Sequence, residues 1–281
     1  MQKIDAHQHF WKFDPVRDSW ITEEMAVIQR DFMPHDLHEV LLSNEITGCI
    51  AVQAPQSEEE NTFLLYLAQK NAFIKGIVGW VDLQADNLES RLQYYQQYDK
   101  MKGFRHILQA EPDDQFMLNE QFKRGISLLN KYGFTYDLLI GPKHLKYANQ
   151  LVQTFPEQRF VIDHMAKPFI KTQEIEQWEN DIRAIAQHQH VYCKVSGFCT
   201  EADWNNWKLD DIRPFLDVIF QAFGSNRVMY GSDWPVCNLA GGYKRSLQCV
   251  EEYVSAFSAS EEALFWGKNA VSFYRLSDLI K

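Results

Sequence analysis

Near its start the chain reads Lys3-Ile4-Asp5-Ala6-His7-Gln8-His9-Phe10-Trp11, a stretch that predicts a strand over residues 3–9 with two histidines at its end. Successive side chains of a β-strand point to opposite faces, so His7 and His9 are expected to share one face. Two imidazoles that converge at a strand end can bind one divalent cation, or can hold a polarised water or carbonyl. This pair predicts that other strands supply it with polar partners.

Downstream of this strand, short runs rich in β-branched or aromatic residues alternate with longer segments of helical period. The eight predicted strands cover residues 3–9, 48–54, 74–82, 102–108, 134–140, 159–164, 191–196 and 227–232. A strand-helix unit repeated eight times favours a parallel sheet. Eight units that close on themselves form an α/β fold of the (β/α)8 TIM-barrel type, expected here as a single domain over 1–281. An open doubly wound sheet is the alternative, but no Gly-x-Gly-x-x-Gly follows the first strand, so a dinucleotide site is not indicated.

The segments between the strands carry helix start signals and one apolar face. Pro34 can occupy the first turn of a helix that runs through residue 43, and Ser57 with Glu60 has the pattern of a capping box. Ser258 with Glu261 opens a last helix in the same way. Apolar residues recur at spacings of three and four in two further segments, Ile175, Trp178, Ile182 and Ile185, and Phe215, Val218, Ile219 and Ala222.

The composition limits the classes of partner. Of the 281 residues 46% are hydrophobic, and the formal net charge of −10 argues against a broad basic surface for nucleic acid or a Lys-rich face for an anionic membrane. No apolar run approaches the roughly 20 residues that span a bilayer, and the N-terminus lacks a secretory pattern, so a cytoplasmic protein is expected. The cysteines form no Cys-x-x-Cys pair and are expected to be buried reduced thiols: Cys49, Cys193, Cys199, Cys237 and Cys249. The oligomeric state stays open.

In a TIM barrel, side chains at the C-terminal ends of the strands point toward one mouth, so ionisable groups are expected there. The predicted strand ends carry His7, His9, Arg105, Asp137, His164, Lys194 and Asp233. Each of these residues has an ordinary structural explanation by itself, such as a rim charge or a turn cap. Their occurrence at the same end of successive strands indicates an active site. Alternation predicts that two neighbours, Asp163 and His106, turn toward the helix layer.

The connection over residues 10–33 is unusually long for a strand-to-helix link and carries Trp11 and Trp20. Long loops in compact domains are often functional, so this loop is expected either to cover a substrate or to cap the barrel core. Together with Trp234, its tryptophans could stack on the apolar face of a pyranose. Packing at the barrel end is the alternative for all three.

The chain also resembles a known family. His7-x-His9, His164 and Asp233 fall on the first, sixth and eighth predicted strands and match the pattern of the amidohydrolase superfamily. Nearly the whole chain is similar to the amidohydrolase-related branch, which hydrolyses lactones derived from sugars and aromatic compounds. The motifs that carry this narrower resemblance are Asp5-Ala6-His7-Gln8-His9-Phe10-Trp11, Arg30-Asp31-Phe32, Val52-Gln53-Ala54, Gly103-Phe104-Arg105-His106, Gln109-x-Glu111-Pro112-Asp113, Asp163-His164-x-x-Lys167-Pro168, Lys194-x-Ser196-Gly197 and Gly231-Ser232-Asp233-Trp234-Pro235.

The resemblance also bears on the metal content of the site. Binuclear members of the superfamily use a carboxylated lysine on strand four and a histidine on strand five, where this chain has Arg105 and Asp137. At most one divalent ion, with zinc as the preferred metal, is then expected on His7, His9 and Asp233. The resemblance further implies that some lactonases of this branch work without any metal.

The resemblance implies hydrolysis of a sugar-acid lactone of the L-fucono or L-rhamnono type, a small-molecule substrate. On this hypothesis Asp233 is the general base that activates water, and Arg105 and His164 face the carbonyl oxygen. A lactone has an alkoxide leaving group, so a mononuclear or metal-free site is chemically sufficient. The residues expected to bind the sugar are Lys194, Gln53, Asp137, Trp11, Trp20 and Trp234, with a structural salt bridge as the alternative for Lys194.

Two other functions remain open. A decarboxylase of an aromatic or unsaturated acid would share the histidines and Asp233, and analysis of the products separates it from a lactonase. A non-catalytic barrel that binds a metal or a sugar would need no general base, so Asp233→Asn would leave its ligand affinity intact.

Overall fold

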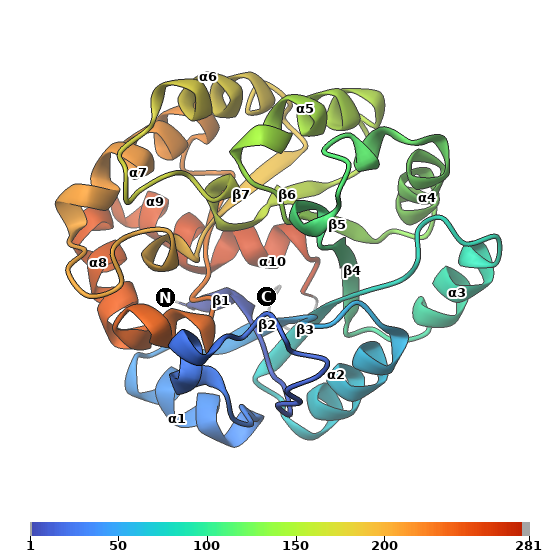
Figure 1. Cartoon of the computed structure of the whole chain (residues 1–281), viewed down its shortest axis with the longest axis horizontal. Helices are drawn as coiled ribbons and strands as arrows, with labels where there is room; N and C mark the ends of the chain where they lie inside the picture. The colour runs from blue at the N-terminus through green and yellow to red at the C-terminus, as the bar shows by residue number, and fades with distance from the viewer. Residues whose placement is uncertain (1, 277–281) are drawn as a thin grey trace.

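The computed structural model describes residues 2–276, and the rest of the predicted domain, residues 1 and 277–281, lies outside them. The described part contains an eight-stranded parallel sheet whose strands follow the order of the sequence. This sheet curls into a ring with helices on its outside, which confirms the predicted (β/α)8 barrel (Figure 1). The strands are β1 (Ile4–Gln8), β2 (Gly48–Val52), β3 (Ile74–Gly79), β4 (Met101–His106), β5 (Thr135–Leu138), β6 (Phe160–Ile162), β7 (Val191–Val195) and β8 (Val228–Tyr230).

The outer layer consists of helices that connect one strand to the next. The helices are α1 (Pro34–Ser43), α2 (Glu58–Lys70), α3 (Leu88–Tyr95), α4 (Glu120–Lys131), α5 (Leu145–Thr154), α6 (Glu176–Ile185), α7 (Leu209–Phe223), α8 (Gly242–Val254), α9 (Ala259–Ala263) and α10 (Asn269–Phe273). As predicted, α1 begins with Pro34 in its first turn, and Ser258 with Glu261 forms a capping box at the start of α9. Among residues 2–276, no helix combines the length and the apolar character needed to cross a membrane.

The start of α2 differs from the prediction in one respect. Ser57 does cap the helix, because its side chain accepts a hydrogen bond from the Glu60 N–H at 3.3 Å. The Glu60 carboxylate does not complete a capping box. It turns inward, accepts a hydrogen bond from the Ala54 N–H at 3.3 Å and is only 6% exposed. The Glu60 side chain therefore bonds to the backbone of the loop that follows β2 and not to the start of its own helix.

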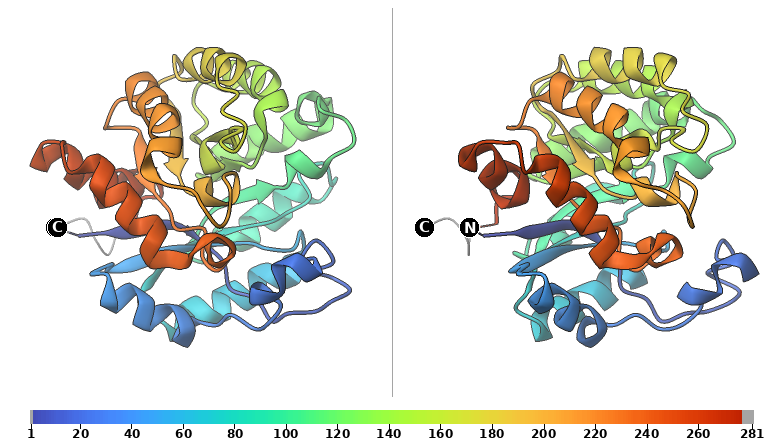
Figure 2. Two further views of the ribbon diagram at one scale, coloured as in Figure 1. Left: turned by 60° about the vertical axis from the view of Figure 1, so that its left-hand side comes forward. Right: turned by 90° about the vertical axis from the view of Figure 1, so that its left-hand side faces the viewer.

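Two apolar cores hold the barrel together. The larger one lies between the sheet and the helices, and a smaller one fills part of the barrel interior. The interior core consists of Ile4, Ala6, Ile50, Val52, Val78, Val161 and Met229 from the strands, with Ala270, Phe273, Tyr274 and Leu276 from the C-terminal segment. Figure 2 shows this segment, in red, on the side of the barrel where β1 begins. The chain's own C-terminal segment thus packs against the starts of the strands, and polar groups gather at the opposite end.

The ring closes where β1 meets β8. Among the described residues the pairing here is a parallel bridge between Gln8 and Trp234, beyond the end of β8. The His9 N–H donates to the Trp234 carbonyl at 2.7 Å, and the Asp233 N–H donates to the His7 carbonyl at 2.8 Å. We call this junction the β1–β8 seam. Its backbone hydrogen bonds lie at the mouth of the barrel.

A buried carboxylate reinforces the β1–β8 seam. Asp5 Oδ1 accepts hydrogen bonds from the Ser232 N–H at 2.9 Å and from the His7 N–H at 3.2 Å. Asp5 Oδ2 accepts one from the hydroxyl of Tyr243, in α8, at 3.1 Å. One side chain therefore ties together the first strand, the turn after the last strand and a helix of the outer layer.

The long connection between β1 and α1 projects from the mouth end of the barrel (Figure 2). It contains a short helix, η1 (Glu23–Ile28), and is anchored by a two-way backbone hydrogen-bond bridge between Trp11 and Phe32. Trp11 is buried, whereas Trp20 is 47% exposed.

Candidate active site

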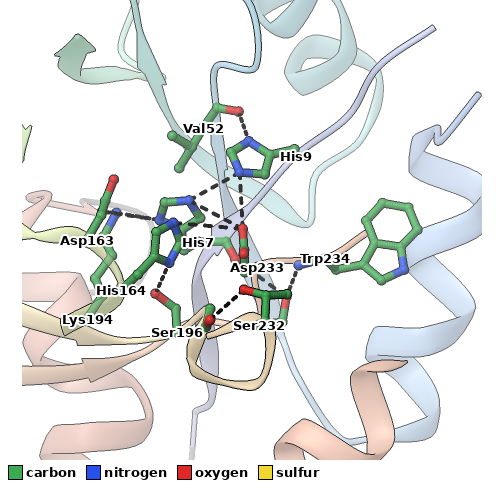
Figure 3. A network of polar contacts seen from close by, with 12 residues as sticks. His7, His9, Val52, Asp163, His164, Lys194, Ser196, Ser232, Asp233 and Trp234 are labelled. Carbon is green, nitrogen blue, oxygen red and sulfur yellow. Dashed lines mark hydrogen bonds and ion pairs between the residues drawn. The ribbon is translucent and has the colours of Figure 1, made fainter. Parts of the chain in front are cut away.

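Four polar side chains meet at the mouth, where β1 and β8 end (Figure 3). His7 Nε2 and His9 Nε2 lie 3.2 Å apart, and Asp233 Oδ1 lies 3.3 Å from His9 Nε2 and 3.9 Å from His7 Nε2. His164, which follows β6, places its Nε2 3.9 Å from the same oxygen. The side chains of His9, His164 and Asp233 are 5–8% exposed, so solvent reaches the cluster only at its outer edge.

An irregularity in β1 brings His7 into this cluster. Ala6 packs in the interior core, so strict alternation would turn His7 to the opposite face of the strand. However, the register between β1 and β2 shifts just ahead of Gln8, and His7 contacts Lys194 inside the barrel. His7 and His9 do come together as predicted, but through a break in the strand and not through regular alternation.

A hydrogen bond to the backbone determines which ring nitrogen of His9 carries a proton. His9 Nδ1 lies 2.7 Å from the Val52 carbonyl oxygen, which can only accept, so Nδ1 carries the proton. Nε2 then presents its lone pair to Asp233 Oδ1 at 3.3 Å. A lone pair and a carboxylate oxygen at this distance repel each other unless a proton or a metal ion lies between them. The geometry therefore calls for a positive charge at the centre of the cluster.

His7 has a partner at each nitrogen in either tautomer. When Nδ1 carries the proton, it faces Asp163 Oδ1 at 3.2 Å, and Nε2 accepts a hydrogen bond from Arg105 Nη1 at 3.3 Å. When Nε2 carries the proton, Nδ1 accepts from Lys194 Nζ at 3.2 Å and Nε2 donates to His9. Only the first tautomer leaves a lone pair on Nε2 that a metal could use.

His164 reaches the mouth on a left-handed turn. Residues 164–167 all have positive φ, between 50° and 57°, although none of them is glycine. Such a conformation costs roughly 1–2 kcal/mol per residue, so the surrounding structure must hold it in place. Met165 and Ala166 are buried, and the Trp178 Nε1–H donates to the Met165 carbonyl at 2.8 Å.

The segment after β7 supports His164 from the other side. His164 Nδ1 lies 2.9 Å from the hydroxyl of Ser196. Gly197, with φ of 60°, packs so closely that a Cβ there would lie 2.6 Å from His164 Nδ1 and 3.2 Å from Asp233 Oδ2. His164 and Asp233 can therefore take up these positions only because residue 197 has no side chain.

The prediction that Asp163 turns toward the helix layer is wrong. Val161 points into the barrel, and Asp163, two residues further on, shares its face. The left-handed turn then swings His164 to the mouth, out of alternation. Asp163 is fully buried, with Oδ2 accepting from Arg105 Nη1 at 3.0 Å and Oδ1 2.9 Å from Lys194 Nζ.

His106 lies on the helix side of the sheet, as predicted. Its ring stacks on Phe116 at 5.2 Å and meets Phe122, in α4, edge to face. Its Nε2 lies 2.6 Å from Glu111 Oε1, so the motif that contains Glu111 serves this outer contact.

A buried ionic network lies beneath the cluster. Lys194 Nζ donates to Asp137 Oδ2 at 2.6 Å, and the same oxygen accepts from the hydroxyl of Tyr274, in the C-terminal segment, at 2.8 Å. With Asp163 and Arg105 this network holds two carboxylates and two fixed cations. Asp233 adds a third carboxylate, so the whole assembly has an excess negative charge until an imidazole is protonated or a metal binds.

Burial dominates the pKa values of His7 and His164. It lowers the pKa of His7 well below its usual range and the pKa of His164 to about 4, because neither ring is hydrated in its charged form. Burial also opposes the ionisation of Asp233, but the neighbouring imidazoles outweigh it and lower the pKa of this carboxyl. At neutral pH Asp233 is therefore a carboxylate, the form that accepts a proton or binds a metal.

The donor set fits a single divalent cation. Ligand atoms of His7, His164 and Asp233 all lie within 4.8 Å of one another, and His9 Nε2 is 3.2 Å from His7 and 3.3 Å from Asp233. A zinc ion with bonds of about 2.0–2.1 Å holds adjacent ligands about 3.3 Å apart in a tetrahedron. The separation of His9 from His7 and those of Asp233 from each imidazole, 3.2–3.9 Å, are close to that value, and the ligand atoms of His7 and His164 lie within 4.8 Å of each other. His164 therefore joins the predicted set of His7, His9 and Asp233.

Most of the residues predicted to bind the sugar are buried. Lys194 and Asp137 are fully buried and bonded to each other, which matches the salt-bridge alternative for Lys194. Gln53 is also fully buried, and its backbone carbonyl oxygen accepts from Arg105 Nη2 at 2.6 Å. Of the three tryptophans, Trp20 alone is substantially exposed.

The other two tryptophans are buried in the packing of the barrel end. The Trp11 Nε1–H donates to the Arg30 carbonyl at 2.9 Å, and Trp234 meets Phe10 and Phe32 edge to face. Figure 3 shows the Trp234 ring pointing away from the histidines.

Comparison with known proteins adds an independent line of evidence. A family model described as amidohydrolase matches residues 4–276. The L-fucono-1,5-lactonase of Burkholderia multivorans is 36% identical over 98% of this chain and 97% of its own length. The L-fucono-1,5-lactonase of Burkholderia ambifaria is 32% identical over 98% of this chain and 96% of its own length. A crystal structure of a Burkholderia multivorans amidohydrolase with bound zinc superposes with a TM-score of 0.95 at 36% identity, covering 98% of this chain and 99% of that one.

Proposed function

The chain belongs to the amidohydrolase family, and on that basis we propose that it hydrolyses the lactone ring of a sugar acid, with lactones of the L-fucono type as its preferred substrates. The names of two relatives at 36% and 32% identity support the substrate class. The observation that carries the proposal is the Asp233 carboxylate, which lies among three imidazoles at the mouth of the barrel. A carboxylate in this position is suited to activate water next to a carbonyl group.

Asp233 acts as the general base in this mechanism. Its Oδ1 faces the imidazoles, and Oδ2 lies on the side of Gly197. Oδ2 takes a proton from water as the water oxygen forms a bond to the lactone carbonyl carbon. The carbon–oxygen bond of the ring then breaks, and Asp233 returns the proton to the departing alkoxide. The products are one hydroxyl group and one carboxylic acid.

Positive charge stabilises the oxyanion that forms on the carbonyl oxygen. Arg105, permanently charged, supplies this charge from the floor of the site, where it lies one hydrogen bond from His7. His164 lines the wall as a neutral polar group, because burial lowers its pKa to about 4. Lys194 and Asp163 act indirectly, because each contacts Nδ1 of His7, Asp163 when this nitrogen carries the proton and Lys194 when it does not. Trp20, exposed at the rim, contacts the sugar.

The four ligands described above would hold a divalent ion, for which zinc is the natural choice given the relative with bound zinc. Such an ion would supply Lewis-acid polarisation of the carbonyl and would lower the pKa of a bound water, provided that one coordination position stays open to them. His7 and His9 would serve as its ligands, and Asp233 keeps its role as base. The alkoxide of a lactone leaves more readily than the amine anion of an amide, so a metal-free site is also chemically sufficient.

The test is proton release, followed with a pH indicator, from a panel of L- and D-sugar lactones. The unaltered protein, Asp233→Asn and Asp210→Asn are compared, since Asp210 is an exposed aspartate outside the site. We expect turnover of L-fucono-lactone by the unaltered protein and the Asp210 control, and a loss of at least about 1,000-fold in kcat for Asp233→Asn. Absence of turnover on every lactone, or release of carbon dioxide from an aromatic acid instead, would refute the proposal.

A further inference from the structure

Arg105 donates a hydrogen bond to His7 Nε2, the atom that a metal ion would need as a ligand. With His7 in the tautomer that can bind metal, Nδ1–H faces Asp163 and the Nε2 lone pair accepts from Arg105 Nη1 at 3.3 Å. A nitrogen lone pair can point at one partner at a time. A metal ion can therefore bond to His7 Nε2 only after Arg105 gives up this hydrogen bond.

The charge of Arg105 adds to this competition. Guanidinium groups stay protonated in proteins, and this one is 4% exposed, so water screens its charge poorly. A divalent cation seated on His7 Nε2 would lie next to it in a medium of low dielectric, where like charges repel strongly. Arg105 thus opposes metal binding both by filling a coordination position and by its charge.

Arg105 has other hydrogen-bond partners, so it can lose its contact with His7 and still stay in the site. Nη1 also donates to Asp163 Oδ2 at 3.0 Å, and Nη2 donates to the Gln53 carbonyl at 2.6 Å. These two bonds hold the guanidinium when the contact with His7 is lost. Nε has no hydrogen-bond partner among residues 2–276, so no third bond has to break.

We infer that Arg105 is a built-in competitor of the metal ion for His7 Nε2, and that it sets the metal affinity of the site. The site then has two states. In the metal-free state Arg105 bonds to His7, and in the metal-bound state Arg105 is displaced toward Asp163 and Gln53. This inference rests on the metal site of the proposed function and does not depend on the identity of the substrate.

The test measures zinc affinity directly, by competition of the full-length, metal-stripped protein with a chromophoric chelator. Arg105→Met removes the charge and the donor and keeps the length of the aliphatic chain. We expect it to bind zinc at least about tenfold more tightly than the unaltered protein. The sign is informative, because loss of a residue from a metal site ordinarily weakens binding. Unchanged or weaker binding by a folded Arg105→Met protein would overturn the inference.

Lys167→Met is the matched control. Lys167 also places a positive charge near the cluster, where it lowers the pKa of His164, but it pairs with Glu201 and not with a ligand atom. We expect its zinc affinity to change less than about threefold. An increase equal to that of Arg105→Met would mean that general charge, and not occupation of Nε2, controls affinity, and it would overturn the inference.

A second measurement covers the case in which Arg105→Met does not fold. A crystal structure of the unaltered protein soaked in zinc should show zinc on His7 Nε2 and Arg105 Nη1 beyond hydrogen-bond distance of that atom. Zinc bound by the other ligands, with the Arg105–His7 contact intact, would overturn the inference. Failure of every lactone in the proton-release assay would sink the proposed substrate and leave both zinc measurements valid. A complete lack of zinc binding by both proteins would remove the metal site and this inference together, and would leave metal-free hydrolysis untouched.

Discussion

Gly197 is the residue at which the site is most tightly constrained. It has φ of 60°, in the left-handed region that residues with a Cβ rarely adopt, and the atoms nearest to an added Cβ belong to His164 and Asp233. Both the backbone conformation and the space at this position therefore require glycine. The second requirement is specific to the catalytic cluster, which allows the two to be separated by experiment.

We predict that Gly197→Ala lowers kcat at least about 100-fold, because it displaces the His164 ring from Asp233 by a fraction of an ångström or more. Gly224→Ala is the control. Gly224 follows α7, has φ of 67°, and an added Cβ there would meet only the end of the Asn226 side chain. Both changes should lower the free energy of unfolding, measured by urea denaturation. The backbone cost is about 1–2 kcal/mol at Gly197, which is left-handed, and up to about 3 kcal/mol at Gly224, whose ψ of 164° lies in a region that is essentially restricted to glycine. Equal kcat values for the two variants would contradict the role assigned to Gly197.

The sequence predicts the members of the site better than their contacts. His7, His9, His164, Arg105 and Asp233 were identifiable because polar residues at strand ends must face the mouth, and they do cluster. Asp163 and Ser196 were missed as parts of the site. Nothing in the local sequence predicts that residues 164–167, none of them glycine, form a left-handed turn. Their presence in the two motifs Asp163-His164-x-x-Lys167-Pro168 and Lys194-x-Ser196-Gly197 was the available signal.

At the scale of elements, the β1–β8 seam joins the strand that carries His7 and His9 to the turn that carries Asp233. The seam has few backbone hydrogen bonds, so the buried Asp5 side chain is a large part of what holds the two elements in register. The relative position of base and imidazoles is then a property of this junction.

We predict that Asp5→Ala destabilises the protein by about 2–5 kcal/mol, because it leaves the buried Ser232 N–H and Tyr243 hydroxyl without an acceptor. It should also lower kcat, since the turn that carries Asp233 loses its link to β1. Tyr243→Phe removes a single hydroxyl from the same carboxylate and should cost about 1 kcal/mol with kcat retained. Thermal denaturation and proton release measure the two effects. A destabilised Asp5→Ala protein with full kcat would contradict the link between the seam and catalysis.

The elements themselves were largely predictable. Apolar runs bounded by turn residues located all eight strands, and Pro34, Ser57 and Ser258 located three helix starts. Strand lengths were overestimated, most clearly for β6 and β8, which have three residues each. The cause is tertiary: the turns after these strands bend away early to present His164 and Asp233.

At the scale of the whole molecule, Glu60 links stability to pH. Burial raises the pKa of its carboxyl from 4.5 to about 7, against a hydrogen bond from Ala54 and the charge of Arg17. The unfolded chain releases this proton near pH 4.5, while the folded protein keeps it until about pH 7. The contribution of Glu60 to stability is therefore full below pH 4.5 and is lost as the pH rises through 7.

We predict that Glu60→Gln stabilises the protein by up to about 3 kcal/mol at pH 8 and has little effect at pH 4, because the amide never ionises. Urea denaturation at several pH values measures the difference. Glu59→Gln is the control, since Glu59 is the exposed neighbour on the same helix turn. A difference between Glu60→Gln and the unaltered protein that does not grow between pH 4 and pH 8 would refute the buried, protonated state of Glu60.

The β1–β8 seam also has a consequence for the protein's synthesis. The two histidines of β1 leave the ribosome well before Asp233, which lies more than 220 residues further along the chain. Until β8 is in place beside β1, the imidazole pair has no carboxylate opposite it. A nascent, stalled or clipped chain that lacks β8 thus has no catalytic centre and no complete set of metal ligands. The reactive centre forms only when the turn after β8 pairs with β1, so copies that end before β8 are expected to be inert.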